Sequence, residues 1–200
     1  MAVATQRKPP RLSRELFRAF YATRPDEEHW QLIDGVAVMM TPVTVVHQII
    51  ATNLQLLLLQ ALKHHAPALT ALPRLGVNIA PPVEDYDPEP DVVVIDASIG
   101  RDPNARYIDH FYLAAEIVSA SDRVWVEKKR EIYKLHETCT DILTVQQDRL
   151  EVRVDTRAND IWSEQLLKQP DNLLVLPSLG LIPILKMTDV RLPSRAVRWT

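Results

Sequence analysis

Cysteine and glycine are both scarce in this chain of 200 residues. The single cysteine, Cys139, excludes an intrachain disulfide and a zinc site built from several cysteines, and it is typical of a reducing compartment. The four glycines lie too far apart to form GxGxxG, GxxxxGK or GxSxG. The usual dinucleotide-binding, phosphate-loop and serine hydrolase motifs are therefore excluded.

Long apolar segments are also missing. The longest apolar runs, at residues 56–62 and 173–185, are shorter than the roughly 20 residues of a membrane span, and proline and glycine interrupt the second one. The basic residues near the N-terminus are not followed by the apolar segment of a secretory signal. These features predict a cytoplasmic protein with no membrane partner.

Basic residues are not in excess, because 23 Lys and Arg face 26 Asp and Glu and give a formal net charge of -3. A protein that coats nucleic acid usually carries a strongly basic surface, so this class is disfavoured. A nuclease is not excluded, because its metal ions supply local positive charge.

The chain is long enough to bury a sizeable core without disulfides or a structural metal. It contains no internal repeat, low-complexity run or Gly/Ser linker. We therefore expect a single domain over residues 11–192, with flexible ends at residues 1–10 and 193–200.

Capping and turn residues predict the first elements. Ser13 caps a short helix that ends before Pro25, and two strand-like runs at residues 29–33 and 36–40 flank Asp34-Gly35, which is typical of a hairpin. Thr41, followed by a proline, is expected to cap a long helix over residues 43–65 with one apolar face.

The remaining elements alternate strands with one more helix. Strand-like runs begin at Leu75, Asp91 and Tyr112, and the second is apolar enough to be an interior strand. A helix at residues 123–137 precedes three further strands that start near residues 141, 150 and 162. This order predicts a mixed sheet covered by helices on both faces, an α/β (α+β) fold.

Two carboxylates interrupt the apolar strands. Asp91 opens one buried run and Glu116 lies within the next. A buried carboxylate is costly unless it is paired, protonated or bound to a metal. If the two strands are neighbours, Asp91 and Glu116 meet at one end of the sheet and suit Mg²⁺, whose usual chemistry with paired carboxylates is phosphodiester hydrolysis.

The helix that follows Glu116 reads VWVEKKREIYKLH and brings one lysine toward the sheet. Helical spacing places Lys128 on a face with Val124 and Leu135, and Lys129 on the adjoining face with Tyr133. Either lysine would suit the positioning of an attacking water or the charge of a reacting phosphate.

The motifs resemble those of the Uma-type restriction endonuclease family, part of the PD-(D/E)XK nuclease superfamily. The resemblance covers nearly the whole chain and rests on HWQLIDGVAVMMTPVTVVHQ, EPDVVV, AAEIVSASD, KKREIY and LLVLPSLGLIPIL in that order. It implies a restriction-endonuclease-like fold, dependence on Mg²⁺ with Mn²⁺ as a further possible ion, and nucleic acid, expected to be DNA, as substrate.

The resemblance also implies roles for single residues. Asp91 and Glu116 would be the metal ligands, and Lys129, four residues before Tyr133, would be the catalytic lysine. The superfamily usually places this lysine two residues after the second carboxylate, where this chain has Val118. The helix must therefore supply the lysine, with Lys128 as the reserve.

A further departure concerns the hairpin, where the family commonly carries glutamate and this chain has Gln31. A neutral amide ligates a cation less strongly than a carboxylate does, so we expect weakened divalent binding. This leaves a second hypothesis open, a non-catalytic relative that serves as a nucleic-acid-binding or assembly module. A homodimer is expected by analogy with related folds that cut two strands.

Simpler structural interpretations stand beside these roles. Asp91 would cap the turn after its preceding proline, Glu116 would pair with Arg123, and residues 84–89 would form a solvated acidic loop. Lys128 and its neighbour would belong to a charged helix face. His47 is a weaker candidate for contact with a phosphate or the metal.

The tryptophans at positions 30, 125 and 162 are interpreted as packing aromatics, because they are not interleaved with basic residues as in a single-strand stacking surface. His136 and Cys139 lack a third orienting group, so a thiol nucleophile is disfavoured.

Overall fold

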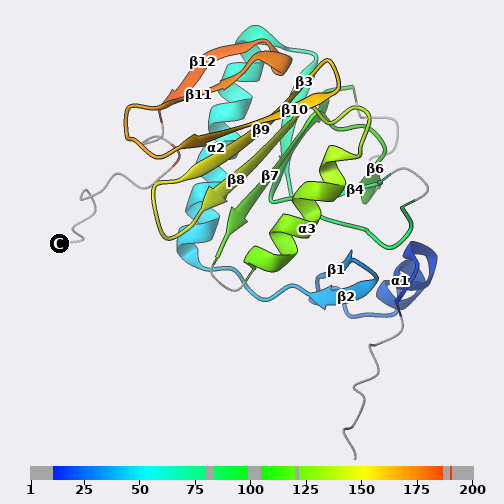
Figure 1. The fold of residues 1–200 in the computed structure, drawn as a ribbon. Helices are drawn as coiled ribbons and strands as arrows, with labels where there is room; N and C mark the ends of the chain where they lie inside the picture. The colour runs from blue at the N-terminus through cyan, green and yellow to red at the C-terminus, as the bar shows by residue number, and fades with distance from the viewer. Residues whose placement is uncertain (1–10, 80–82, 99–104, 120–121, 187–189, 191–200) are drawn as a thin grey trace, which may run out of the picture.

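The computed structural model describes residues 11–79, 83–98, 105–119, 122–186 and 190 (Figure 1). The two ends predicted to be flexible, residues 1–10 and 193–200, lie outside this range.

A mixed six-stranded sheet is the centre of the fold, with strand order β10-β9-β8-β7-β5-β3. β7 and β8 are parallel, and the other neighbouring strands in this sheet are antiparallel. The strands are β3 (Leu69–Pro73), β5 (Val92–Asp96), β7 (Leu113–Val118), β8 (Asp141–Gln146), β9 (Val152–Ala158) and β10 (Ile161–Leu167).

Helices cover both faces of this sheet, as the alternation of strands and helices predicted. α2 (Val45–His65) lies on one face and α3 (Arg123–Lys134) lies on the other, where it forms the crossover between the parallel strands β7 and β8 (Figure 1). α1 (Arg14–Tyr21) lies at the edge of the molecule near the hairpin, and Ser13 caps it as predicted by accepting a hydrogen bond from the Leu16 amide at 3.3 Å.

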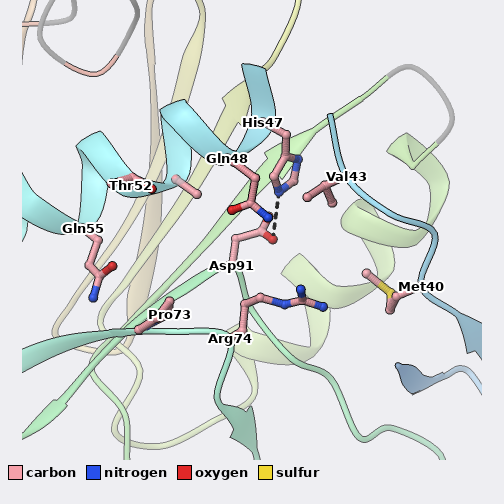
Figure 2. Close-up of a pocket in the computed structure, with 10 residues that line it drawn as sticks. Met40, Val43, His47, Gln48, Thr52, Gln55, Pro73, Arg74 and Asp91 are labelled. Carbon is pink, nitrogen blue, oxygen red and sulfur yellow. Dashed lines mark hydrogen bonds and ion pairs between the residues drawn. The ribbon is translucent and has the colours of Figure 1, made fainter. Parts of the chain in front are cut away.

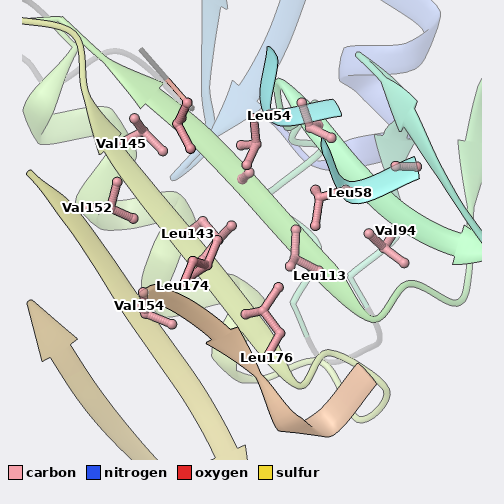
Figure 3. Close-up of a cluster of buried hydrophobic side chains, with 14 of the residues drawn as sticks. Leu54, Leu58, Val94, Leu113, Leu143, Val145, Val152, Val154, Leu174 and Leu176 are labelled. Carbon is pink, nitrogen blue, oxygen red and sulfur yellow. The ribbon is translucent and has the colours of Figure 1, made fainter. Parts of the chain in front are cut away.

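The two faces of the sheet bury separate hydrophobic clusters. On β5, Val92 and Val94 face α2, whereas Val93 and Ile95 belong to the cluster beside α3. Because both faces of β5 are covered, its sequence is uniformly apolar rather than alternating. Figure 3 shows the larger cluster, to which α2 and β11 contribute residues together with β5, β7, β8 and β9.

Three small two-stranded sheets complete the fold. The predicted hairpin joins β1 (Trp30–Ile33) to β2 (Val36–Met39), and Asp34 and Gly35 both have the positive φ that a type I′ turn requires. The other pairs are β4 (Gly76–Val77) with β6 (Tyr107–Ile108), and β11 (Leu173–Leu176) with β12 (Leu181–Lys186), the latter joined by the 3₁₀ turn η1 (Pro177–Leu179).

Some predicted element boundaries were wrong. α2 begins at Val45 with Thr44 as its cap, rather than with Thr41, because the Thr44 hydroxyl accepts from the His47 amide. α3 ends at Lys134 rather than near residue 137. The strand predicted from Leu75 consists of two residues, and edge strand β3 was missed because it is partly exposed and lacks a regular apolar pattern.

α2 is also long and apolar enough, by length and composition alone, to cross a membrane, with a hydropathy of 1.4. The apolar run at residues 56–62 is only part of this helix, because polar residues such as Asn53 and Gln55 precede it. In the structure, Leu54, Leu58 and Leu62 pack in the cluster beneath the helix, so its composition is that of a core helix.

Replacement of Leu58 by alanine tests this packing. Leu58 is fully buried, whereas Leu56 on the same helix is 51% exposed. We expect Leu58→Ala to lower the free energy of unfolding by about 2–5 kcal/mol, measured by urea denaturation, and Leu56→Ala to change it by less than about 0.5 kcal/mol. Equal effects of the two substitutions would contradict the assigned orientation of α2.

Candidate functional site

The register of β5 and β7 brings the two predicted carboxylates to the same end of the sheet. These antiparallel strands pair Val92 with Ala115, so the next position in the register sets Asp91 opposite Glu116. The Asp91 side chain accepts a hydrogen bond from the Ile117 amide at 2.8 Å, which ties it to the strand of Glu116. The expectation that the two strands are neighbours is thus confirmed.

His47, in the first turn of α2, lies against Asp91. Its Nε2 is 3.1 Å from Asp91 Oδ1, and the imidazole is buried (Figure 2). Burial raises the pKa of Asp91, but His47, the charge of Lys129 and the Ile117 amide outweigh it and lower the pKa below its ordinary value. Asp91 is therefore held as a carboxylate, and its bonds go to these groups rather than to a turn.

Glu116 is deeply buried, with 4% of the residue exposed. Lys129 Nζ lies 2.6 Å from one carboxylate oxygen, and the Tyr133 hydroxyl donates to the other at 2.7 Å. Burial raises the pKa of Glu116 to about 7, although Lys129 and Tyr133 act to lower it. The alternative partner, Arg123, is exposed, so the predicted structural pairing was wrong.

The orientation of α3 distinguishes the two candidate lysines. Val124 and Leu135 are 67% and 66% exposed, so the face they share with Lys128 points to solvent. Lys128 forms an ion pair with Asp34 of the hairpin turn. Lys129 is buried on the adjoining face and is the lysine that reaches the carboxylates.

Gln31 joins this group from β1. Its side-chain oxygen accepts from Lys129 Nζ and from the Glu89 amide, both at 3.2 Å, and its amide nitrogen lies 3.1 Å from Met40 Sδ. The hairpin therefore lies beside the carboxylates, as its predicted placement required. The amide of Gln31 supplies no negative charge there.

Hydrogen bonds of the loop at residues 84–89 hold the hairpin beside the carboxylates. Asp87 was predicted to lie in a solvated acidic loop, but it is 2% exposed and accepts two hydrogen bonds of 2.8 Å from Arg18. It also pairs through its backbone with Leu32 of β1. Two residues further on, the Glu89 carbonyl accepts from Lys129 at 3.3 Å. The loop is therefore part of the framework of the site.

A cavity of about 280 Å³ lies at this site, and all its walls other than the polar ones are apolar. The polar residues that line it are Gln31, Thr41, His47, Asp91, Glu116, Asp122 and Lys129. A second, smaller hollow of about 50 Å³ also borders the Asp91–His47 pair, and Figure 2 shows residues that line it. The structure thus brings together every predicted site residue except Lys128.

The donor set suits a magnesium ion that relies on its substrate for further ligands. Among the residues that the structure describes, no group of three or more His, Cys, Asp or Glu side chains could hold a metal. Mg²⁺ is commonly bound by one or two carboxylates together with water and phosphate oxygens, whereas zinc prefers a closed set of nitrogen and sulfur ligands. Asp91 and Glu116 therefore fit the former ion.

Tyr133 was not predicted as a site residue, although its position four residues after Lys129 gave a signal. Residues four apart share a helix face, so a lysine directed toward a buried carboxylate brings this tyrosine with it. Cys139, the thiol that was disfavoured as a nucleophile, is fully buried, and burial raises the pKa of the thiol well above its ordinary value. It is not available for nucleophilic chemistry.

Comparison with known proteins agrees with this fold. The mixed sheet with helices on both faces has the architecture of restriction-endonuclease-like nucleases. A family model described as "Uma2: Putative restriction endonuclease" matches residues 14–187, and the chain belongs to this family.

A solved structure supports the same fold. The crystal structure of a protein from Anabaena variabilis, described as "a putative nuclease belonging to DUF820", superposes with a TM-score of 0.72 at 19% sequence identity. The match covers 90% of this chain and 97% of that chain. No curated protein matches the sequence.

The hydrogen bond between Tyr133 and Glu116 yields a stability prediction. At about pH 8, where Glu116 is ionised, Tyr133→Phe should lower the free energy of unfolding by about 1.5–3 kcal/mol, because a buried carboxylate loses a donor. In the matched variant Tyr112→Phe, the hydroxyl lost is one that bonds the less buried Asp96 at 3.1 Å, so the loss should be smaller. Urea denaturation measures both, and equal losses would contradict the buried bond.

Proposed function

We propose that this protein hydrolyses phosphodiester bonds of nucleic acid, expected to be DNA, with Mg²⁺ as cofactor and Mn²⁺ as a substitute. The observation that carries the proposal is the pair of carboxylates, Asp91 and Glu116, set opposite each other with Lys129 against the second. Membership of the Uma2 family supports it. A homodimer belongs to the same proposal.

Each residue has a role that its position supports. Asp91 and Glu116 would hold the ion through oxygen atoms, and the ion when bound would polarise the phosphate and lower the pKa of the attacking water. Lys129 is close enough to Glu116 to reach a phosphate oxygen beside the ion and stabilise its growing negative charge. His47 holds Asp91 in position through its hydrogen bond.

One observation favours the non-catalytic alternative. Gln31 provides an amide where a third carboxylate would stand, and the Lys129 ammonium already neutralises Glu116. A site with this charge balance binds a divalent ion more weakly than one with three carboxylates. Such a protein would bind nucleic acid through the same fold without cutting it.

A plasmid nicking assay with Mg²⁺ or Mn²⁺ tests the proposed activity. Asp91→Asn should lower the rate at least about 100-fold, because the ion loses an anionic ligand. Asp96→Asn is the matched control, since Asp96 ends the same strand and bonds Tyr112 instead. It should nick as wild type does. Equal rates for wild type and Asp91→Asn would assign the nicking to another protein and favour the non-catalytic alternative.

A carboxylate at position 31 should strengthen the metal site. Gln31→Glu places negative charge beside Lys129 and the carboxylates, and the attraction of a carboxylate for a dication is on the order of a few kcal/mol even after screening. Calorimetry should show tighter Mn²⁺ binding, and any nicking should become faster. Gln165→Glu, an exposed position on β10, is the control for added charge.

A different result would contradict the placement of the hairpin beside the metal site. If Gln31→Glu left Mn²⁺ affinity unchanged while Asp91→Asn abolished binding, the metal site would stand and the hairpin would lie outside the reach of the ion.

A further inference from the structure

The walls of the larger cavity are unusual for a site that handles only charged groups. Beside its polar residues, Asp122 and Thr41 among them, the cavity is lined by a tryptophan, two methionines and several aliphatic side chains, namely Ile33, Val38, Met39, Met40, Val43, Ile117, Trp125 and Val126. Phosphate oxygens, water and a divalent ion gain nothing from an apolar wall, because charged groups lose hydration there. The apolar part therefore needs a ligand of its own.

Trp125 is placed where such a ligand would meet the reacting phosphate. It lies on α3 four residues before Lys129, so both side chains lie on the same side of the helix. The indole is only partly buried and borders the cavity, while Lys128 Nζ lies 5.3 Å from the ring centroid. Trp125 packs against the cluster beside α3, as expected of a packing aromatic, and its partly open ring also borders the cavity.

We propose that this cavity, with Trp125 as its stacking surface, binds one unpaired nucleobase of the substrate, so that the protein acts on single-stranded DNA in preference to duplex. The inference rests on the proposed nuclease function and specifies its substrate. A nucleobase combines a flat apolar face with a covalent link to a phosphate, and bases in single strands are free to stack on aromatic side chains. Bases paired within a duplex are not.

The size of the cavity agrees with one small group. Its volume of about 280 Å³ lies just below the roughly 300–1,000 Å³ of sites that enclose a whole drug-sized ligand. Met39 at its rim is 52% exposed, so the apolar wall is open to an incoming group.

The smaller hollow beside Asp91 adds polar groups to the site. Gln48, Thr52 and Gln55 follow each other along α2 and line this hollow together with Arg74 and the apolar Met40, Val43, Ala51 and Pro73 (Figure 2). Amide, hydroxyl and guanidinium groups of this kind suit the sugar-phosphate backbone. A strand that crosses Asp91 would thus meet polar groups for its backbone next to the cavity that takes a base.

The backbone of Arg74 is consistent with such a role. Its φ is 48°, in the left-handed region that non-glycine residues rarely adopt, and its guanidinium bonds Glu89 at 3.1 Å. Its amide donates to the Asp91 carbonyl at 3.2 Å. Strained backbone of this kind is often retained next to functional groups.

Fluorescence anisotropy of a short labelled DNA strand, alone or annealed to its complement, tests the inference. Ca²⁺ replaces Mg²⁺, so binding is read without reliance on turnover. Wild type should bind the single strand more tightly than the duplex. Trp125→Leu keeps apolar bulk without an aromatic face and should weaken single-strand binding roughly 5- to 100-fold, with duplex binding changed less than about twofold.

Two further variants make the result specific. Trp125→Phe retains an aromatic ring and should keep most of the single-strand affinity. Trp162→Leu is the matched control, because Trp162 lies on β10, donates to the Lys134 carbonyl and does not line the cavity. Its affinity should equal that of wild type. If Trp125→Leu proves unfolded by circular dichroism, Met39→Gln at the exposed rim replaces it and should weaken single-strand binding.

The outcomes separate this inference from the nuclease proposal. Duplex binding as tight as single-strand binding, or unchanged single-strand affinity in a folded Trp125→Leu variant, would overturn the base site even if plasmid nicking depends on Asp91. A single-strand preference that requires Trp125 would support the base site even if wild type failed to nick plasmid.

Discussion

The arrangement of the segments around the site depends on how the charge of the buried Glu116 carboxylate is compensated. Glu116 lies within a strand whose neighbours on both sides are covered, and the removal of its charge from water is costly unless other groups compensate. The compensation comes from Lys129 at 2.6 Å and the Tyr133 hydroxyl at 2.7 Å, both on α3. The position of α3 on the sheet is therefore coupled to the charge that it covers.

The hairpin and the acidic loop are linked to Glu116 indirectly, through Lys129. Lys129 donates to the side chain of Gln31 and to the carbonyl of Glu89, so its ammonium has partners on three segments that are distant in the sequence. Asp87, clamped by Arg18, holds the loop that carries Glu89. Polar contacts that are mutually satisfied in this way define one arrangement of the segments around the site.

The sequence predicted those features whose signal is local. The Asp34-Gly35 hairpin, the capped first helix, the interior strand β5 and the conflict between Glu116 and its apolar neighbours can each be recognised within a few residues. The choice of Lys129 over Lys128 needed the direction of α3, which the resemblance implied and helical periodicity alone did not. The burial of Asp87 depends on Arg18, 69 residues earlier, and no local pattern indicates that partnership. The edge strand β3 was missed for a similar reason, since its pairing with β5 rather than its own composition makes it a strand.

The ion pair between Lys129 and Glu116 is compatible with a metal site, because either the Lys129 ammonium or a divalent ion would neutralise the Glu116 carboxylate. Without a divalent ion, an ammonium is what keeps a carboxylate buried to 4% exposure from remaining uncompensated. With Asp91 and Glu116 holding an ion, Glu116 would no longer depend on Lys129 alone for its compensation, and the flexible stem of Lys129 would leave the ammonium within reach of a phosphate. The same side chain would then stabilise the fold before the substrate arrives and the reacting phosphate afterwards. Val118, at the position where the superfamily usually has its lysine, is 1% exposed and apolar, so the strand itself offers no second ammonium for either task.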